Sequence, residues 1–316
     1  MNTDTGRRMH YGAFYGEGAA PPDDRPLWLV VGNCQAEALR QVLEAVPDRP
    51  YRTVRIPPVH EIGPSDLPYL DALLATSAML VSQPIRVGYR DLPLGTSELA
   101  ERLSPSATCL RWPVIRYAGL YPFQAIVRHP ADRSVVPPVV PYHDLRTVAA
   151  ARAGLSPTAA WDVDVTVEQL RAAAGASRAE LARREQRDCD VGISDLLEQC
   201  GARAAHTINH PGNPVLEALG GRILNAAGLR LPVPTISRTL LDSVHAPLES
   251  RVLTALAIDT APRSHWMHHG TPLSVDKVHA AQLNWYAANP EYVELAITRH
   301  AEMMDILGLL AVSTAS

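Results

Sequence analysis

The 316-residue sequence predicts an α/β fold, in which a mostly parallel sheet lies between two layers of helices and a helical elaboration follows. Between residues 26 and 112, short apolar runs alternate with helix-patterned segments, which is typical of parallel strands joined by helices. After about residue 140 the pattern becomes mainly helical. We therefore expect residues 26–316 to form a single α/β domain with helical additions after about residue 150.

Four apolar runs are the expected strands, and the segments between them are the expected helices. The strands cover residues 27–31, 51–56, 78–82 and 107–112, and the helices cover 35–46, 66–76 and 96–103. In the first helix, Leu39, Val42 and Leu43 follow the spacing of one helix face. Because ligands bind beyond the carboxyl ends of parallel strands, we expect a site where the first and third strands end.

The later segments are predicted from capping and charge patterns. A charged stretch at 177–188 is expected to be a helix with a solvated face. Asn213 followed by Pro214 predicts a helix over 214–226 with Asn213 as its N-cap. Further helices are expected at about 274–288 and 291–309, and loops at 206–213 and 264–270. Residues 1–25 lack the apolar run of a secretory signal and are expected to form a flexible tail or an arm on the surface.

Composition argues against several classes of function. The net charge is -4 and acids and bases are interspersed, so the chain has no basic stripe and no nucleic acid is expected as a partner. No apolar run is long enough to span a membrane. No glycine-rich phosphate motif follows the first strand, which argues against a dinucleotide or a nucleoside triphosphate.

Cysteines and histidines do not form a metal-binding pattern. The four cysteines, at positions 34, 109, 189 and 200, include no Cys-x-x-Cys pair, so we expect reduced thiols in a cytoplasm and neither a zinc site nor a redox dithiol. His265, His268 and His269 cluster, but no carboxylate or cysteine accompanies them at ligand spacing. We expect these histidines to be solvated or stacked, and we assign no metal.

The tetrapeptide Gly32-Asn33-Cys34-Gln35 places a thiol at the turn from the first strand to the first helix. Unpaired amides and the helix dipole at such a turn favour a thiolate, which is a nucleophile. Asn33 and Gln83, with the amides of Cys34 and Gln35, are the expected donors to an oxyanion. The alternatives are a buried cysteine that packs as a small hydrophobe, a turn-forming Asn33 and a strand-capping Gln83.

A series of motifs in this order resembles the WcbI-type polysaccharide biosynthesis proteins. The motifs are Gly32-Asn33-Cys34-Gln35, Ser82-Gln83-Pro84-Ile85 with Tyr89-Arg90, residues 113–122, Tyr142-His143-Asp144, Arg184-Glu185, residues 190–195 and Asn209-His210-Pro211. The resemblance covers about residues 27–230 and is weaker in the tail and the last third. It implies acetyltransferases of capsule assembly that bind coenzyme A, with a three-layer architecture similar to SGNH-type hydrolases, in which the nucleophile follows the first strand.

The general base is expected among the histidines. His210 is the first candidate, because it lies in a loop at a helix start, where scaffold-held functional residues concentrate. Its alternative role is to cap or pack the loop. His143 with the adjacent Asp144 is the second candidate, although neighbours in sequence form a relay only if the backbone turns. His206 and His245 rank below both.

Coenzyme A carries phosphates, so its site requires arginines or helix N-termini near the nucleophile. Arg86, Arg90, Arg111 and Arg116 follow the expected strand ends, and Gly32 and Gln35 flank the thiol. Each arginine has the alternative of being a solvated surface residue.

The expected function is acyl transfer through Cys34, from an acyl-CoA to a hydroxyl or amine of a sugar, a secondary metabolite or another small molecule. The alternatives are a thioesterase or esterase of the same fold, and a non-catalytic protein that binds coenzyme A or senses redox state. The sequence predicts neither the acceptor, the acyl group nor the oligomeric state.

Overall fold

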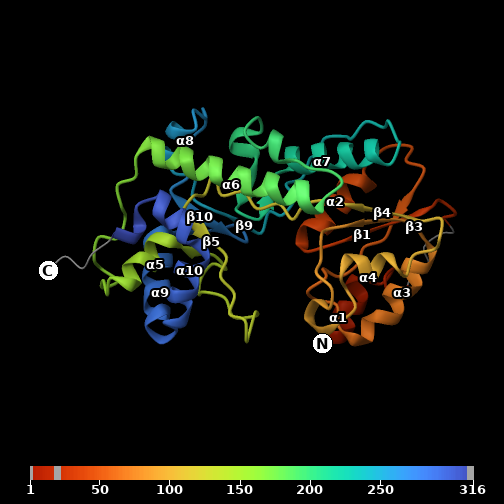
Figure 1. The fold of residues 1–316 in the computed structure, drawn as a ribbon, viewed down its shortest axis with the longest axis horizontal. Coiled ribbons are helices and arrows are strands. Elements are labelled where there is room, and N and C mark those ends of the chain that lie inside the picture. Colours follow the sequence, from red (N-terminus) through yellow and green to blue (C-terminus); the bar gives the residue numbers. More distant parts are fainter. Residues whose placement is uncertain (1–2, 18–22, 312–316) are drawn as a thin grey trace. The chain divides into compact units, whose positions relative to one another are not determined.

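A computed structural model describes residues 3–17 and 23–311 (Figure 1). Contacts divide the chain into two compact units. The first contains residues 1–115, 181–200 and 212–241, and the second contains 116–180, 201–211 and 242–316. The units interleave along the chain, and a single domain over residues 26–316 stays a prediction.

A four-stranded parallel sheet forms the centre of the first unit, with strand order β2-β1-β3-β4. The strands are β1 (Leu27–Val31), β2 (Arg52–Thr53), β3 (Ser77–Ser82) and β4 (Thr108–Arg111). The four predicted strands are confirmed, although the second is only two residues long. The register pairs Val31 with Ser82 and Ser82 with Arg111, so three strands end in one row at the carboxyl edge of the sheet.

Helices cover both faces of this sheet, as the α/β prediction requires (Figure 1). They are α2 (Cys34–Glu44), α3 (Leu67–Thr76), α4 (Thr96–Ala100) and α7 (Asn213–Ala226). Leu29 and Val31 of β1 share one core cluster with Leu70 of α3. On the other face, Val42 of α2 packs with Leu216 of α7. Alternate side chains of a strand point to opposite faces, which explains why the whole of β1 is buried.

The N-terminal segment packs on the first unit. After α1 (Thr3–His10), Phe14 and Tyr15 are buried, and Tyr15 donates a hydrogen bond to Asp66 at 2.9 Å. Arg7 forms an ion pair with the same carboxylate at 2.9 Å. Residues 3–17 therefore form an ordered arm rather than a flexible tail, because its aromatic side chains reach the core. Residues 1–2 and 18–22 of the predicted tail lie outside the described residues.

The second unit is mainly helical, as expected after residue 150. Its helices are α5 (Leu145–Arg152), α8 (Ser250–Ala255), α9 (Val275–Ala288) and α10 (Glu291–Ile306), together with most of α6 (Val167–Asp188), which continues into the first unit. Val148, Tyr286 and Met304 belong to its core cluster. The helices predicted at 274–288 and 291–309 and the helix over 177–188 are thereby confirmed.

Short strands complete the second unit and correct two predicted loops. They are β5 (Gln124–Ala125), β6 (His143–Asp144), β7 (Ala205–Thr207), β8 (His210–Pro211), β9 (Val244–His245), β10 (His265–His268) and β11 (Thr271–Ser274). The segment 206–213 is not simply a loop, since β7 pairs with β8. The histidine-rich segment is half of a hairpin whose turn, at His269 and Gly270, has positive φ at both residues.

The predicted N-cap of α7 is also corrected. Gly212 occupies the N-cap position, and the Asn213 side chain donates to the carbonyls of Ile236 and Arg238 and accepts from the amide of Leu240. A capping residue was expected from local sequence, whereas these partners lie more than 20 residues away in the chain.

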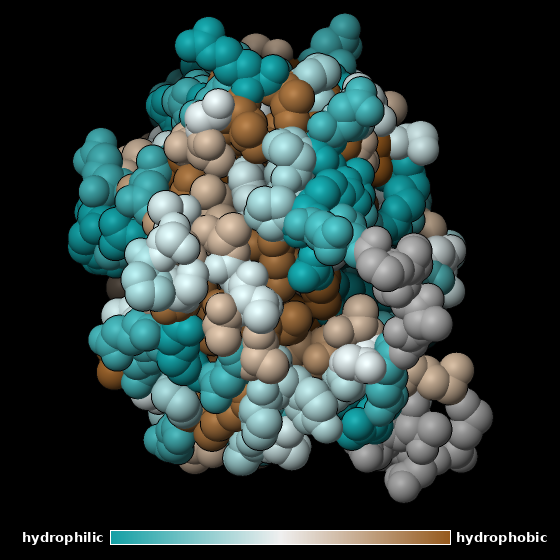
Figure 2. Space-filling view, turned by 90° about the vertical axis from the view of Figure 1, so that its right-hand side faces the viewer, coloured by the Kyte–Doolittle hydropathy of each residue, from teal (hydrophilic) through white to brown (hydrophobic). Residues whose placement is uncertain are grey.

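One face of the molecule, on the side of the four-stranded sheet, carries hydrophilic and intermediate residues with smaller hydrophobic areas between them (Figure 2). Within the described ranges, no helix combines the length and the apolar character that crossing a membrane requires.

Candidate active site

Cys34 is the first residue of α2 and follows β1 by a two-residue turn. Asn33 is the N-cap, and its Oδ1 accepts a hydrogen bond from the Gln35 amide at 2.9 Å. The Cys34 side chain is half-buried, and its sulfur forms no disulfide. The structure therefore confirms the strand-to-helix placement of this thiol.

Two buried glutamines fix the turn. Gln83 Oε1 accepts from the Asn33 amide at 2.9 Å, and Gln83 Nε2 donates to Gln35 Oε1 at 3.0 Å. Gln35 also accepts from the Ile115 amide at 3.0 Å and donates to the Ile115 carbonyl at 2.7 Å. Both glutamine side chains are almost fully buried. Gln83, predicted as an oxyanion donor, and Gln35, predicted to contact the cofactor, thus have positioning roles in the network.

Gly32 allows the network to approach the backbone. A Cβ atom at this position would lie 2.5 Å from Gln83 Oε1, which is closer than real Cβ contacts. The Gly32 carbonyl accepts from the Val59 amide at 2.8 Å. Glycine is therefore required here for the close approach of Gln83, and its predicted contact with a cofactor stays a prediction.

The Cys34 sulfur is held as a thiol. Burial raises its pKa above the ordinary value, and the backbone N–H groups of Cys34 and Gln35, which face the sulfur, lower it by less. The prediction that the helix start favours a thiolate is therefore wrong for the free protein, because desolvation outweighs the two amides. A base must remove the proton before this sulfur can attack a carbonyl.

Asn33 leaves one donor available at the turn. While its Oδ1 caps the helix, its Nδ2 donates to no other group in the described part of the chain. A small cavity beside it is lined by Asn33, Glu37, Arg40 and Pro58, among others. The Asn33 Nδ2 and the Cys34 amide are the donors that this turn offers to an oxyanion.

The predicted phosphate-binding arginines differ in their engagement. Arg86 is exposed, and its guanidinium contacts no partner among residues 3–17 and 23–311. Arg90 is also exposed and donates to the His60 carbonyl at 2.9 Å, while its own φ of 56° is left-handed. Arg111 is ion-paired with Asp190 at 3.0 Å, so it is less available to a phosphate. Arg116 is exposed and belongs to the second unit.

His210, the first candidate base, lies in the second unit on the short strand β8, opposite Thr207 of β7. Its ring is half-buried and meets the Tyr142 ring edge-on, with centroids 6.4 Å apart. The neighbouring Asn209 accepts a hydrogen bond from the Tyr142 hydroxyl at 2.8 Å. Tyr142 and Asn209 thus hold the Asn209-His210-Pro211 segment in place.

His143 and Asp144 do not form a relay. His143 is buried in the core of the second unit, where its Nδ1 contacts the Tyr286 hydroxyl, and burial lowers its pKa to about 3. Asp144 is the N-cap of α5 and forms an ion pair with Arg146. Adjacent strand residues point to opposite sides, so the two side chains belong to separate networks.

His245, which ranked below His210 and His143 as a candidate base, lies next to a carboxylate that the sequence did not single out. His245 Nε2 contacts Asp242 Oδ1, and the His206 ring lies 4.3 Å from the His245 ring. Burial lowers the pKa of His206 to about 4, and the neighbouring His245 and His210 contribute to this shift. The three-residue spacing of Asp242 and His245 was the only signal of this pair in the sequence, since its contact with His206 spans nearly 40 residues.

Comparison with known proteins matches this arrangement to one family. The family model for polysaccharide biosynthesis enzyme WcbI matches residues 27–232. The chain belongs to the WcbI family. The match covers almost the same residues as the motifs that suggested the resemblance, and it includes the Cys34 turn, the strand-end Gln83 and the His210 segment.

One solved structure with this family fold is similar to the chain over most of its length. It is described as WcbI, a novel polysaccharide biosynthesis enzyme, in its native form without a disulfide bond between coenzyme A and one of its cysteines. The identity is 17%, the TM-score is 0.75, and the match covers 91% of this chain and 100% of that one. This likeness confirms the α/β fold with its helical C-terminal region. No curated protein matches the chain.

Among the residues that the structure describes, no three histidine, cysteine or carboxylate side chains are arranged to hold a metal ion. In the first unit, the Cys34 thiol lies beside the amide donors of its turn. A thiol of raised pKa needs a general base before it can act as a nucleophile.

Proposed function

We propose that this protein transfers an acyl group from an acyl-CoA to a hydroxyl or amine of a saccharide or small-molecule acceptor, with Cys34 as the nucleophile. The observation that carries the proposal is the Cys34 sulfur at the start of α2, faced by two backbone amides and next to the available Asn33 Nδ2. Membership in a polysaccharide biosynthesis family supports a saccharide acceptor, and the description of the solved structure supports coenzyme A as the carrier.

In the first step, Cys34 loses its thiol proton to a base and the sulfur attacks the carbonyl carbon of the thioester. The carbonyl oxygen becomes an oxyanion, to which the N–H groups of the turn donate. Collapse breaks the carbon–sulfur bond to coenzyme A, which takes the proton back and leaves as a thiol. In the second step, the acceptor loses a proton to the base, attacks the acyl carbon and releases Cys34 as a thiol.

We assign the base to His210. It lies beside the hydrogen-bonded Asn209 and Tyr142, and it is half-buried rather than enclosed in a core. His143 is not assigned this role, because its ring is buried against Tyr286. We assign the phosphates of coenzyme A to Arg86 and Arg90, with Arg116 as a further candidate, and we place the reaction in the cytoplasm.

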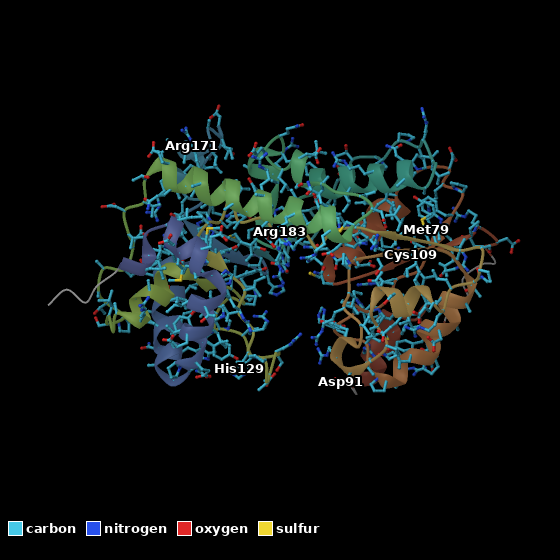
Figure 3. The ribbon with its side chains drawn as sticks, viewed as in Figure 1. Met79, Asp91, Cys109, His129, Arg171 and Arg183 are labelled. Carbon is cyan, nitrogen blue, oxygen red and sulfur yellow. The ribbon has the colours of Figure 1, made fainter. Side chains whose placement is uncertain are left out.

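Intact-mass spectrometry after incubation with acetyl-CoA tests this proposal. The wild-type protein should gain one acetyl group, and Cys34→Ala should gain none. The matched control is Cys109→Ala, which removes another half-buried free thiol from within β4, on the strand next to Met79 of β3 (Figure 3). An acetyl adduct on Cys34→Ala, or none on wild type, would contradict the covalent mechanism.

A second candidate function is favoured by the description of the solved structure, which mentions a disulfide between coenzyme A and a cysteine. In that case Cys34 would hold coenzyme A as a mixed disulfide without turnover. Incubation with oxidised coenzyme A would then add the mass of the whole coenzyme, and a reductant would remove it. Acyl transfer and this storage role differ in whether acetyl-CoA releases free coenzyme A thiol. If coenzyme A thiol is released from acetyl-CoA as fast without an acceptor as with one, the protein is a thioesterase.

A further inference from the structure

The second unit contains a pocket of its own, formed between β5, β6, α5, α9 and β10. Tyr142, Trp161, Trp266 and Phe123 are among the side chains of its wall. The space between the walls is about 500 Å³, including the part open to solvent, and about 30 Å³ of it can hold the centre of a water molecule. The enclosed part is therefore narrow and holds only a few water molecules, so a sugar ring would lie mainly in the part that is open to solvent, and a whole coenzyme would not fit.

Three buried polar atoms of the wall have no hydrogen-bond partner in the described part of the chain. They are Gln124 Nε2, Gln282 Oε1 and His279 Nε2. These side chains are 8%, 0% and 2% exposed, so solvent does not satisfy them from outside. Buried polar groups are nearly always paired, which makes three such atoms in one pocket an indication of a polar ligand.

The orientation of each side chain is fixed by its other polar atom. Gln124 Oε1 accepts from the Ile208 amide at 3.1 Å, so the opposite atom must be the NH₂ donor. Gln282 Nε2 donates to the Tyr142 carbonyl at 2.7 Å, so its remaining atom is an acceptor. His279 Nδ1 pairs with Thr147 Oγ1 at 2.8 Å. The residues of the wall thus leave one donor and one acceptor unpaired, and a hydroxyl group can satisfy both.

The charges of the pocket argue against an anion. Arg146 is the cation of the wall, and its guanidinium is engaged by Asp144 at 2.6 Å, Asp162 at 2.8 Å and Glu249 at 3.0 Å. Asp144 and Glu249 themselves line the pocket. A phosphate or carboxylate would meet two carboxylates and no available cation, so this is not where coenzyme A phosphates bind.

Aromatic rings close the remaining sides. Trp161 stacks on the His279 ring with centroids 4.2 Å apart, and Trp266 stacks on Tyr142 at 5.8 Å. Fixed aromatic walls with a few convergent polar groups are typical of small-ligand sites. We propose that this pocket binds one uncharged sugar ring, and that this ring belongs to the acyl acceptor. The binding of the ring is independent of the proposed function, whereas its role as the acceptor rests on that function.

The test is a saturation-transfer NMR titration with the methyl glycosides of glucose, galactose and mannose, and with methyl glucuronide as the anionic match of the glucoside. At least one neutral glycoside should bind, and the glucuronide should bind at least tenfold more weakly than the glucoside. Gln124→Glu keeps an acceptor for Ile208 but turns the pocket donor into an acceptor, so the dissociation constant should rise at least tenfold. Trp161→Ala, in a partly exposed segment, should give a similar loss.

Gln169→Glu is the matched control, because this glutamine also accepts from a backbone amide, that of Thr166, but lies outside the pocket. Its binding should be unchanged. If no glycoside binds, as expected where ordered water satisfies the three atoms, the proposal is overturned. It is also overturned if Gln124→Glu and Trp161→Ala bind the glycoside as tightly as wild type. Cys34→Ala should bind the sugar as wild type does, so loss of the acetyl adduct and loss of sugar binding are separate outcomes.

Discussion

Two pairs of buried glutamines serve opposite purposes in the two units. In the first unit, Gln35 and Gln83 bond to each other and to the backbone on both sides of the Cys34 turn. In the second unit, Gln124 and Gln282 line the pocket, and each uses one end of its amide and leaves the other end without a partner in the described part of the chain. A closed network fixes geometry, whereas a half-used amide is prepared for a ligand.

The histidines reinforce this contrast. Ten of the twelve histidines belong to the second unit, and only His10 and His60 belong to the first. Burial lowers the pKa of several in the second unit, to about 3 for His143 and about 4 for His206. The first unit thus fixes the position of the Cys34 thiol, and the stability of the second unit is expected to depend on pH.

Lowering the pH should have the largest effect, because it should destabilise the second unit through its buried histidines. The folded pKa of His143 is about 3 and the usual value is 6.5, so the unfolded chain binds the proton first as the pH falls. Stability from this group is present above pH 6.5 and is lost between pH 6.5 and 3. At 1.36 kcal/mol per pH unit, the loss should reach about 3 kcal/mol at pH 4.

Urea unfolding at pH 7 and pH 4 measures this effect. His143→Gln should be less stable than wild type at pH 7 but should lose about 3 kcal/mol less on acidification. His129→Gln, at a half-buried position in the same unit, is the control and should keep the wild-type acid slope. Equal slopes for wild type and His143→Gln would contradict the prediction.

Opening the closed network should have the next largest effect. Gln35→Leu leaves the amide and the carbonyl of Ile115 buried without this partner, so the free energy of unfolding should fall by about 2–3 kcal/mol. Gln186→Leu, at an exposed position of α6, should change it by less than about 0.5 kcal/mol. Chemical denaturation compares the two, and similar losses would indicate that the network does not stabilise the turn.

Adding one methyl group to the turn is the next test. Gly32→Ala forces Gln83 away from the backbone, and overpacking of this kind costs about 2 kcal/mol. The control is Gly221→Ala in α7, where a Cβ would meet its nearest neighbour at 3.8 Å. That variant should be up to about 1 kcal/mol more stable, from helix propensity. A stable Gly32→Ala protein in thermal melts would mean that the approach of Gln83 is not tight.

Local patterns were sufficient to predict the architecture of the first unit. The apolar runs, the helix-patterned segments between them and the turn at Cys34 are all visible within windows of a few residues. The same reasoning failed where partners are distant. Asn213 is followed by proline and was expected to be an N-cap, but its side chain bonds to residues 236–240.

Burial was the other property that local patterns could not predict. A helix start favours a thiolate, but only the folded structure shows that desolvation raises the pKa of Cys34. His143 and Asp144 are adjacent in sequence and separate in the fold. Gln124 became a pocket residue only because the amide of Ile208, 84 residues later, fixes its orientation.

The smallest expected loss of stability concerns Asn33, whose roles as the cap of α2 and as an oxyanion donor can be separated by two substitutions. Asn33→Ala removes both the cap of α2 and the Nδ2 donor, so stability should fall by about 1 kcal/mol. Asn33→Ser keeps an acceptor for the Gln35 amide and should preserve stability. If Nδ2 stabilises the oxyanion, both variants should form the acetyl-enzyme about a hundredfold more slowly, because loss of one such donor has an effect of roughly this size. Time-resolved mass spectrometry beside thermal melts measures both quantities, and a serine variant that acylates at the wild-type rate would leave Asn33 with the capping role alone.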